Sequence, residues 1–314
     1  MSRMVGMEHR GRPPGAGAEP IVDLDLARRR LGRVGVWSSA LGALPAARER
    51  ERVQQMEALG YSTLWVNETR KEAFAHAGLV LSATTTMTVA TGIANVWRRE
   101  PDTAVRGANT LAEAYDGRFV LGVGIGHARF DASYARPLAT MRAYLEGMVR
   151  SADEGPAPVT PVPWLLAALR PGMVALAAEY AEGVHPYLVP PEHTAAVRQA
   201  LGPRPLVAPE LGVVLDSDAV TARATARAHL QEYLALENYV NSWRSLGFGD
   251  ADFGGGGSDR LVDALVAWGD VERVRSRVEE HLAAGADHVA VQPLTADGRF
   301  PGEELAELAP ALLA

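Results

Sequence analysis

The chain has 314 residues, a formal net charge of −7 and no cysteine. The lack of cysteine excludes disulfides, thiolate metal sites and a cysteine nucleophile. The acidic balance argues against a nucleic-acid binder, which needs clustered cations, and no apolar run approaches the ~20 residues that span a bilayer. We therefore expect a cytoplasmic protein that acts on a small molecule, with no nucleic-acid or membrane partner.

Residues 1–20 contain Gly, Pro and Arg without periodicity and are predicted to form a flexible N-terminal tail. The fold is expected to begin at Ile21, and residues 21–314 are predicted to form a single domain.

Eight apolar runs follow, each with the length and the continuous hydrophobicity of a parallel strand buried on both faces. In chain order they are Gly32–Trp37, Thr63–Val66, Thr86–Thr91, Arg118–Val123, Pro163–Ala168, Val184–Val189, Pro205–Ala208 and His288–Gln292. Helical segments separate them, and several of these helices end on a glycine, namely Gly60, Gly117, Gly183, Gly202 and Gly285. This alternation predicts an α/β fold, a closed (β/α)8 TIM barrel; an open doubly wound sheet is the structural alternative.

Two long segments interrupt the rhythm. Residues 127–160 follow the fourth strand and contain a predicted helix, Pro137–Arg150, and residues 218–269 follow the seventh strand and are largely helical. Because extra material after the carboxyl end of a barrel strand usually shapes the pocket, both segments are candidate lids.

Polar residues that follow strands are the first catalytic candidates, because these ends face the mouth of a barrel. Asn67 and Glu68 end the second strand, and His127 follows the fourth. Histidine titrates near neutrality, and desolvation can make a glutamate a general acid or base. The alternatives are a loop-capping role for His127 and a surface ion pair of Glu68 with Arg70 or Lys71.

Glycines after the fourth strand, Gly122, Gly124 and Gly126, suggest dinucleotide binding at first sight. The Rossmann fingerprint needs a helix that opens at once and an acidic residue about 20 positions later, and neither is present. We interpret the glycines as places where the backbone approaches a ligand or a neighbouring strand.

Arg170-Pro171-Gly172 stands where the fifth strand turns into a helix, so backbone N–H groups and the guanidinium could hold a phosphate together. The alternative is a helix that starts on proline beside a solvated arginine. Glu210-Leu211-Gly212 and Gln292-Pro293, after strands seven and eight, are secondary phosphate candidates. Scattered histidines and the lack of a nucleophile elbow give no sign of a metal enzyme or a serine hydrolase, which favours cofactor chemistry.

Five motifs in this order resemble the luciferase-like monooxygenase superfamily, and most closely its actinobacterial branch that uses coenzyme F420, a 5-deazaflavin. They are Leu64–Glu68, Thr91–Pro101, Leu121–His127, Glu179–Gly183 and Gly285–Gln292. The resemblance extends from Leu31 to Leu294 and implies a TIM barrel with the deazaflavin ring at the mouth.

The resemblance also implies roles for particular residues. Gly92-Ile93 matches a non-prolyl cis peptide that forms a bulge behind the ring, and Glu68 and His127 match catalytic positions. The implied cofactor-binding residues are Asn67, Gly92, Ile93, Asn95, Gly124, Gly126, Ala168, Arg170 and Gly172. His127 stands where related sugar-phosphate dehydrogenases carry an acidic proton donor, and Arg170 replaces a small residue, so oxidation of a sugar phosphate is not expected.

The implied reaction is hydride transfer between carbon 5 of F420 and a small organic substrate, with His127 or Glu68 moving the proton. The same fold with FMN would be a monooxygenase. A non-catalytic F420-binding protein and a metal-free barrel lyase are further alternatives, and a homodimer is among the forms that the family allows.

Overall fold

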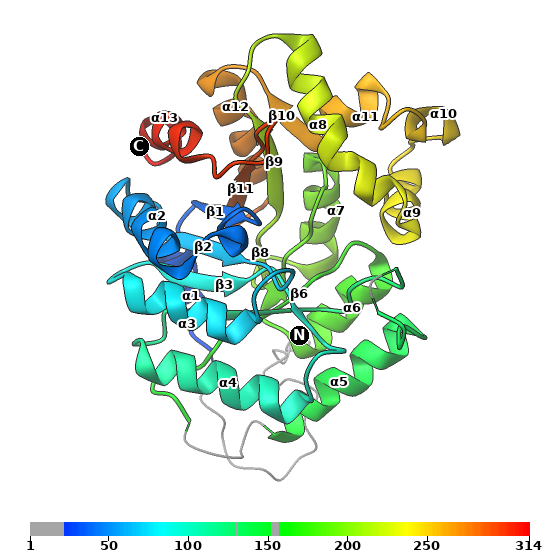
Figure 1. Cartoon of the computed structure of the whole chain (residues 1–314). Coiled ribbons are helices and arrows are strands. Elements are labelled where there is room, and N and C mark those ends of the chain that lie inside the picture. The colour runs from blue at the N-terminus through cyan, green and yellow to red at the C-terminus, as the bar shows by residue number, and fades with distance from the viewer. Residues whose placement is uncertain (1–21, 130, 152–156) are drawn as a thin grey trace, which may run out of the picture.

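The computed structural model describes residues 22–129, 131–151 and 157–314, so the predicted tail lies outside the described residues. Its centre is one sheet of 11 strands in which all pairings are parallel (Figure 1). The strands are β1 (Val34–Ser38), β2 (Thr63–Val66), β3 (Thr88–Thr91), β4 (Ala94–Asn95), β5 (Phe119–Gly124), β6 (Trp164–Leu166), β7 (Gly183–Val184), β8 (Leu206–Val207), β9 (Glu210–Val214), β10 (Val266–Trp268) and β11 (Val289–Pro293).

The sheet curls into a barrel because β8 and β9 are consecutive parts of one segment. β8 pairs with β7, while β9 pairs with β11, which in turn lies beside β1. The Asp287 N–H donates to the Val207 carbonyl (2.8 Å) and the Ala290 N–H to the Pro209 carbonyl (2.9 Å), which continues the seam across the break. The eight predicted strand positions therefore form the barrel, and β10 extends the sheet beyond β9.

Helices cover the outside of the sheet. They are α1 (Leu24–Leu31), the short 3-10 helix η1 (Leu41–Ala43), α2 (Ala46–Ala58), α3 (Ala73–Ala83), α4 (Pro101–Ala114), α5 (Pro137–Ser151), α6 (Pro171–Tyr180), α7 (Pro191–Leu201), α8 (Ala219–Leu234), α9 (Glu237–Ser245), α10 (Asp250–Phe253), α11 (Asp259–Leu265), α12 (Val271–Ala283) and α13 (Gly302–Leu312). Among the described residues, no helix is long and apolar enough to cross a membrane.

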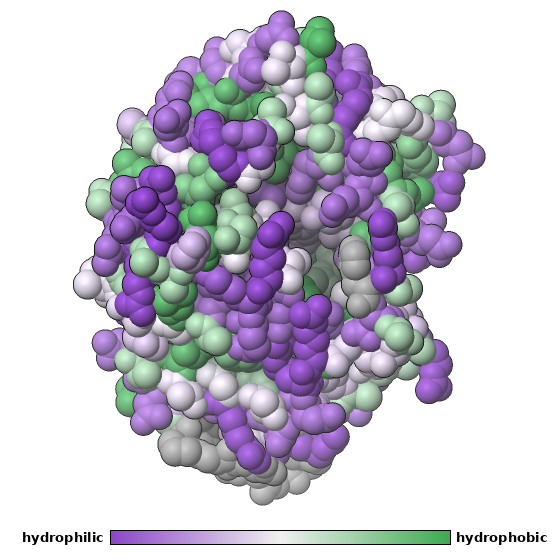
Figure 2. Space-filling model, viewed as in Figure 1, coloured by the Kyte–Doolittle hydropathy of each residue, from purple (hydrophilic) through white to green (hydrophobic). Residues whose placement is uncertain are grey.

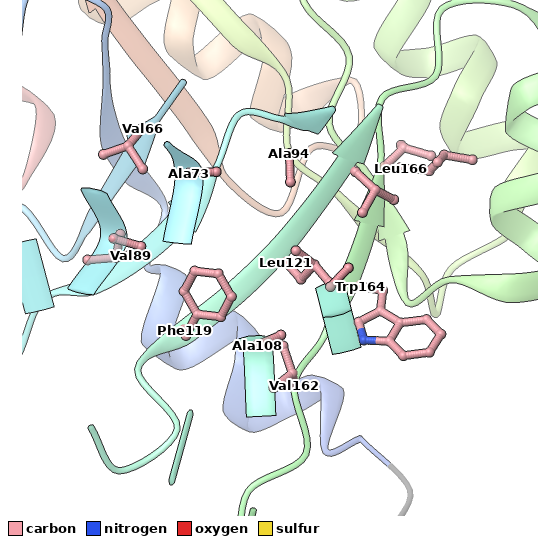
Figure 3. Packing of buried hydrophobic residues seen from close by; sticks show 14 of the residues in the cluster. Val66, Ala73, Val89, Ala94, Ala108, Phe119, Leu121, Val162, Trp164 and Leu166 are labelled. Atoms are coloured by element: carbon pink, nitrogen blue, oxygen red, sulfur yellow. The ribbon is translucent and has the colours of Figure 1, made fainter. Parts of the chain in front are cut away.

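Strand residues alternate between two buried environments, as the two-residue period of a strand requires. Val66, Val89, Phe119 and Leu121 point outward and pack under the helices (Figure 3). Their neighbours point into the barrel and form a separate interior cluster with Ala27 and Leu31 of α1, which closes the bottom of the barrel; these neighbours include Trp65, Ala90, Val120 and Leu165.

The two predicted insertions are present where expected. α5 lies between β5 and β6, and α8 to α11 lie between β9 and β11. The second insertion has a hydrophobic core of its own, in which Trp243 is fully buried among residues of α8 and α11 such as Leu230 and Leu261. In Figure 1 these helices form a block at the upper right, away from α2 to α4.

Two strand predictions need correction. The sixth strand covers only Gly183–Val184 rather than residues 184–189, because Pro186 has no N–H to donate and Leu188 adopts a positive φ of 53°. The predicted seventh strand is interrupted after β8 and resumes as β9, beyond the predicted end at Ala208. The segment before Gly269, which the sequence predicts to be largely helical, contains β10. Gly183 is also not a helix cap, because α6 ends at Tyr180.

The barrel predicts a strong effect at Gly122. A Cβ at this position would stand 1.9 Å from the Thr91 carbonyl oxygen, whereas a Cβ at Gly254 would have nothing within 4 Å. We expect Gly122→Ala to lower the free energy of unfolding by about 3 kcal/mol or more, as overpacking against backbone does, and Gly254→Ala to leave it nearly unchanged. Urea denaturation of both variants measures this, and equal stabilities would contradict the packing described for β3 and β5.

Candidate functional site

The carboxyl ends of the parallel strands converge on one end of the barrel, where the ligand sites of such folds lie. The face seen in Figure 2 is hollowed near its middle, close to the position of β6, β8 and α7 in Figure 1, and most residues around the hollow are hydrophilic. A cleft beside α12, lined in part by β10, and a cleft beside α1 also occur among the described residues, but neither is lined by a predicted site residue. The strand-end residues are therefore the candidate site.

Glu68 is buried at the end of β2 and is held by an ion pair with Arg99. Both side chains are less than a tenth exposed (4% and 7%). Arg99 also contacts Glu72, and Glu68 Oε2 accepts the backbone N–H of Asn95 at 2.8 Å. The alternative of a surface ion pair is wrong, because Glu68 is buried and pairs with Arg99, while Lys71 pairs with Glu49. The carboxylate of Glu68 thus fixes the position of the β4 strand.

The Gly92-Ile93 peptide bond is cis, as the family resemblance implies. Two buried polar atoms lie beside it, Trp37 Nε1 and His185 Nε2, and neither has a hydrogen-bond partner in the described part of the chain. A Cβ on Gly92 would come within 2.4 Å of the first and 3.2 Å of the second. Because His185 Nδ1 donates to the Ala208 carbonyl (2.6 Å), its Nε2 can only accept a hydrogen bond. A donor and an acceptor therefore point at one place.

His127 lies after β5 and faces the second insertion. Its Nδ1 is 3.2 Å from Asn238 Oδ1, and its ring centroid is 5.5 Å from that of Tyr239. Burial lowers the pKa of His127, and the hydrogen bond to Asn238 opposes this only in part. The imidazole is consequently neutral at pH 7, with its proton on Nδ1 and its lone pair on Nε2.

Gly124 at the end of β5 and Gly126 after it let the backbone lie close to the β4 segment. A Cβ on Gly124 would meet Ile93 Cδ1 at 2.5 Å, and one on Gly126 would meet Asn95 Nδ2 at 2.9 Å. No helix follows at once, since α5 begins at Pro137. The structure agrees with close approach of the backbone rather than with a dinucleotide-binding turn.

The remaining predicted positions lie around the same end. Asn67 is buried, and its Oδ1 accepts from the Thr69 hydroxyl; Ala168 is buried directly after β6. Arg170 is exposed at the N-cap of α6, and Gly172 in the first turn faces Leu138 of α5. The secondary candidate Glu210 offers no free N–H to an anion, because its N–H donates to the Pro186 carbonyl at 2.9 Å.

Opposite Glu68, three tyrosines form a wall that the sequence did not indicate. Tyr187 follows β7, Tyr233 comes from α8 and Tyr239 from α9, and their ring centroids are 5.0 to 6.4 Å apart. Tyr233 donates to the Tyr187 hydroxyl at 3.1 Å, which donates to Gln292 Oε1 at 2.8 Å. Residues from three distant segments meet here, so only the spacing of Tyr187 after its strand could have signalled the wall.

Glu210 lies behind this wall and is fully buried. Its Oε2 accepts the Leu188 N–H at 3.0 Å, while Oε1 has no hydrogen-bond partner. Burial raises the pKa of Glu210 to about 8, which the single hydrogen bond does not reverse. The carboxyl group is therefore mostly protonated at pH 7, which is the expected response of a buried acid without a cation.

Comparisons with known proteins identify the family and the fold of the chain. The sequence model of the family described as luciferase-like monooxygenase matches residues 31–288. A search of curated proteins finds no match. Solved structures with the same fold include an F420-dependent secondary alcohol dehydrogenase bound to an F420-acetone adduct, which is 15% identical, has a TM-score of 0.71, and covers 89% of this chain and 98% of its own.

Two further solved structures have similar coverage. The coenzyme F420-dependent tetrahydromethanopterin reductase from Methanopyrus kandleri is 18% identical with a TM-score of 0.66, and the match covers 90% of this chain and 98% of the reductase. The EDTA monooxygenase from Chelativorans sp. BNC1 is 13% identical with a TM-score of 0.68, and the match covers 90% and 93%. At these identities the structures establish the shared fold.

The buried Glu68–Arg99 pair predicts a large loss of folding stability when one partner is removed. Arg99→Met leaves a buried carboxylate without compensation, so we expect it to lower the free energy of unfolding by about 3 to 5 kcal/mol. The double variant Glu68→Gln/Arg99→Met should recover most of that loss. Arg48→Gln, which removes an exposed pair with Glu51, should change stability by less than about 1 kcal/mol. A cost for Arg99→Met no larger than for Arg48→Gln would rule out the buried pair.

Glu210 predicts a pH dependence of stability. Its pKa rises from 4.5 to about 8 on folding, so between these values the folded chain binds a proton that the unfolded chain has lost. Stability therefore falls as pH increases through this window. Relative to wild type, Glu210→Gln should gain up to a few kcal/mol from pH 5 to pH 8, whereas the exposed control Glu192→Gln should track wild type. Chemical denaturation of wild type and Glu210→Gln from pH 5 to pH 8 measures this effect. A difference in unfolding free energy that does not change with pH would count against the raised pKa of Glu210.

Proposed function

Because the chain belongs to the luciferase-like monooxygenase family, we propose that it is an F420-dependent oxidoreductase that transfers hydride between the deazaflavin and a small organic substrate. The observation that carries the proposal is a donor and an acceptor beside the Gly92-Ile93 bond, Trp37 Nε1 and His185 Nε2, which no other described residue satisfies. The F420-dependent enzymes among the structures with this fold support the choice of cofactor.

The residues at the mouth fit a flat heteroaromatic ring. The edge of its pyrimidine part offers both N–H and C=O groups, which match an acceptor and a donor fixed in the protein. Gly124 and Gly126 let the backbone after β5 approach Ile93 and Asn95 closely, and the Asn95 N–H in turn donates to Glu68. The Arg170 guanidinium, which is exposed at the N-cap of α6, can pair with an anionic tail. The first turn adds few backbone donors, because Pro171 has no N–H and the Met173 N–H donates to the Arg170 carbonyl at 3.0 Å.

When bound, F420 supplies hydride chemistry, and the chain supplies orientation and the proton. The proton on His127 Nδ1 faces Asn238, so Nε2 is the atom that accepts a proton from an alcohol or returns one to a carbonyl. Glu68 is engaged by Arg99 and by the Asn95 N–H, so we assign it a positioning role. The insertion that carries Asn238 and Tyr239 helps to exclude water from the site.

Binding titrations test the choice of cofactor. The purified chain should bind F420, and an equal concentration of FMN should not displace it. Selective binding of FMN would contradict the proposal that F420 is the cofactor.

His127 can be tested once F420 binds. His127→Asn should keep F420 affinity within a few-fold, because the neutral imidazole is replaced by an uncharged amide. It should slow hydride transfer about 10²- to 10⁴-fold, which is the usual contribution of a general acid or base. The readout is anaerobic loss or recovery of the deazaflavin absorbance with a panel of alcohols and carbonyl compounds. Glu192→Gln serves as the unaffected control. An unchanged rate in His127→Asn would assign the proton to another group.

An FMN-dependent monooxygenase is the second candidate, because the EDTA monooxygenase has this fold at a comparable TM-score. Reduced flavin reacts with oxygen, whereas a reduced deazaflavin mainly passes hydride. Oxygen consumption that requires FMN would favour this candidate.

A further inference from the structure

The tyrosine wall, defined by Tyr187, Tyr233 and Tyr239, is continuous with the mouth. Tyr187 is 5.1 Å from Trp37 between ring centroids, and Tyr239 is 5.5 Å from His127. Tyr187 and Tyr233 are partly exposed, while Tyr239 is buried. The wall therefore connects the Gly92 side of the mouth with the proposed proton-transfer residue, and aromatic faces dominate it.

The groups along the wall are uncharged at neutral pH. His229 lies 5.2 Å from the Tyr233 ring and 3.2 Å from the Tyr187 hydroxyl, and burial lowers its pKa to about 4. Burial likewise lowers the pKa of His127 and raises that of Glu210, which interacts electrostatically with all three tyrosines. A cation at the wall would have kept Glu210 ionised.

The arginines of the inserted helices are engaged elsewhere. In α8 to α11, Arg223 pairs with Asp259 and Asp263, Arg227 with Asp259, Arg244 with Asp250, and Arg260 with Asp252. An anionic ligand at the wall would thus lose its hydration without gaining one of these cations, which costs several kcal/mol for a buried charge. The wall selects against phosphates and carboxylates.

Polar atoms at the wall fit one hydroxyl or carbonyl group. The hydroxyls of Tyr233 and Tyr187 are hydrogen-bonded to each other, and each can instead form a hydrogen bond with a ligand. Gln292 accepts the Tyr187 O–H and so fixes its direction. The fully buried Glu210 Oε1 has no hydrogen-bond partner among the described residues, and the space beside Gly212 that it borders is lined by the side chains of Val266 and Leu294. Edge and face contacts with the rings favour a planar aromatic body.

We propose that the tyrosine wall is the substrate-binding face and that the substrate is an uncharged aromatic molecule carrying a hydroxyl or carbonyl group. The inference deepens the proposed oxidoreductase function. An alcohol whose hydroxyl is on a saturated carbon beside the ring would give the hydride of that carbon to the cofactor and its O–H proton to His127, and a carbonyl would take up both in reverse; 2-naphthol, which lacks such a C–H bond, is a probe of binding alone. The proposal places the polar group of the substrate between the wall and His127.

Three matched probes test this on the full chain by calorimetry: 2-naphthol, its saturated analogue decahydro-2-naphthol, and 2-naphthyl phosphate. We expect 2-naphthol to bind, the saturated analogue to bind about 3- to 10-fold more weakly for want of aromatic contacts, and the phosphate to bind at least about 30-fold more weakly because its charge must be desolvated. Phosphate binding as tight as that of 2-naphthol, or no preference for the aromatic ring, would overturn the proposal.

Variants locate the binding. Tyr187→Phe should weaken 2-naphthol about 3- to 10-fold through the lost hydroxyl, and Tyr239→Leu by a similar factor through the lost ring. Tyr115→Phe, on α4 beside Arg118, is the matched control and should have no effect. Thermal melting confirms that each variant folds, and the conservative Tyr187→Phe keeps the test valid if Tyr239→Leu does not. Unchanged affinity in Tyr187→Phe and in a folded Tyr239→Leu would place the ligand elsewhere.

F420 binding, measured separately, distinguishes the two proposals. If the probes and variants behave as expected but F420 does not bind, the cofactor assignment fails and the substrate class stands. If F420 binds but 2-naphthol does not, the substrate class fails and the cofactor assignment stands.

Discussion

A ring stack inside the barrel supports everything at the mouth. Trp65 lies flat on His185 with ring centroids 3.9 Å apart, and its Nε1 donates to His288 Nε2 at 3.0 Å. His288 in turn donates from Nδ1 to the Gly32 carbonyl at 2.8 Å. Burial lowers the pKa of His185 to about 3 and that of His288 to about 4. The floor of the mouth is therefore rigid, aromatic and uncharged, with fixed imidazole tautomers.

Because the floor carries no charge, the two sides of the mouth set its electrostatics. On the β2 and β3 side, Glu68 and Arg99 form a compact buried pair that neutralises itself and holds β4. On the opposite side, the tyrosine wall and Glu210 present neutral groups. Such a mouth suits a reaction in which hydride and proton leave or arrive together, because neither side stabilises a lasting charge.

The sequence was sufficient for the barrel and its two insertions, because strands buried on both faces and glycine-capped helices leave a regular local pattern. Gly60, Gly117, Gly202 and Gly285 all have positive φ, as their cap positions require. The cis bond at Gly92 came from family resemblance and from no local physical signal.

Contacts between distant segments could not be predicted in the same way. Arg99 rather than Lys71 binds Glu68, although 31 positions separate the pair, because β4, which pairs with β5, brings the Asn95 N–H and the following Arg99 to the carboxylate at the end of β2. The sequence places Glu210 after the seventh strand, whereas in the structure Ala208 and Pro209 only interrupt that strand and Glu210 begins β9. The tyrosine wall needs three segments to meet, and no spacing in the sequence records that.

The separate core of the second insertion has a consequence for how such a protein can change. Trp243 and its neighbours bury one another with few barrel residues, and the Trp243 Nε1 bond to the Leu188 carbonyl (3.1 Å) is a link to the strand side. Substitutions in that core alter the wall while the barrel interior keeps its own packing. On the proposed assignment of the tyrosine wall to the substrate and of the barrel floor to the cofactor, most of each surface rests on its own core. Tyr187, which packs against both cores, is then the side chain through which a change in one would reach the other.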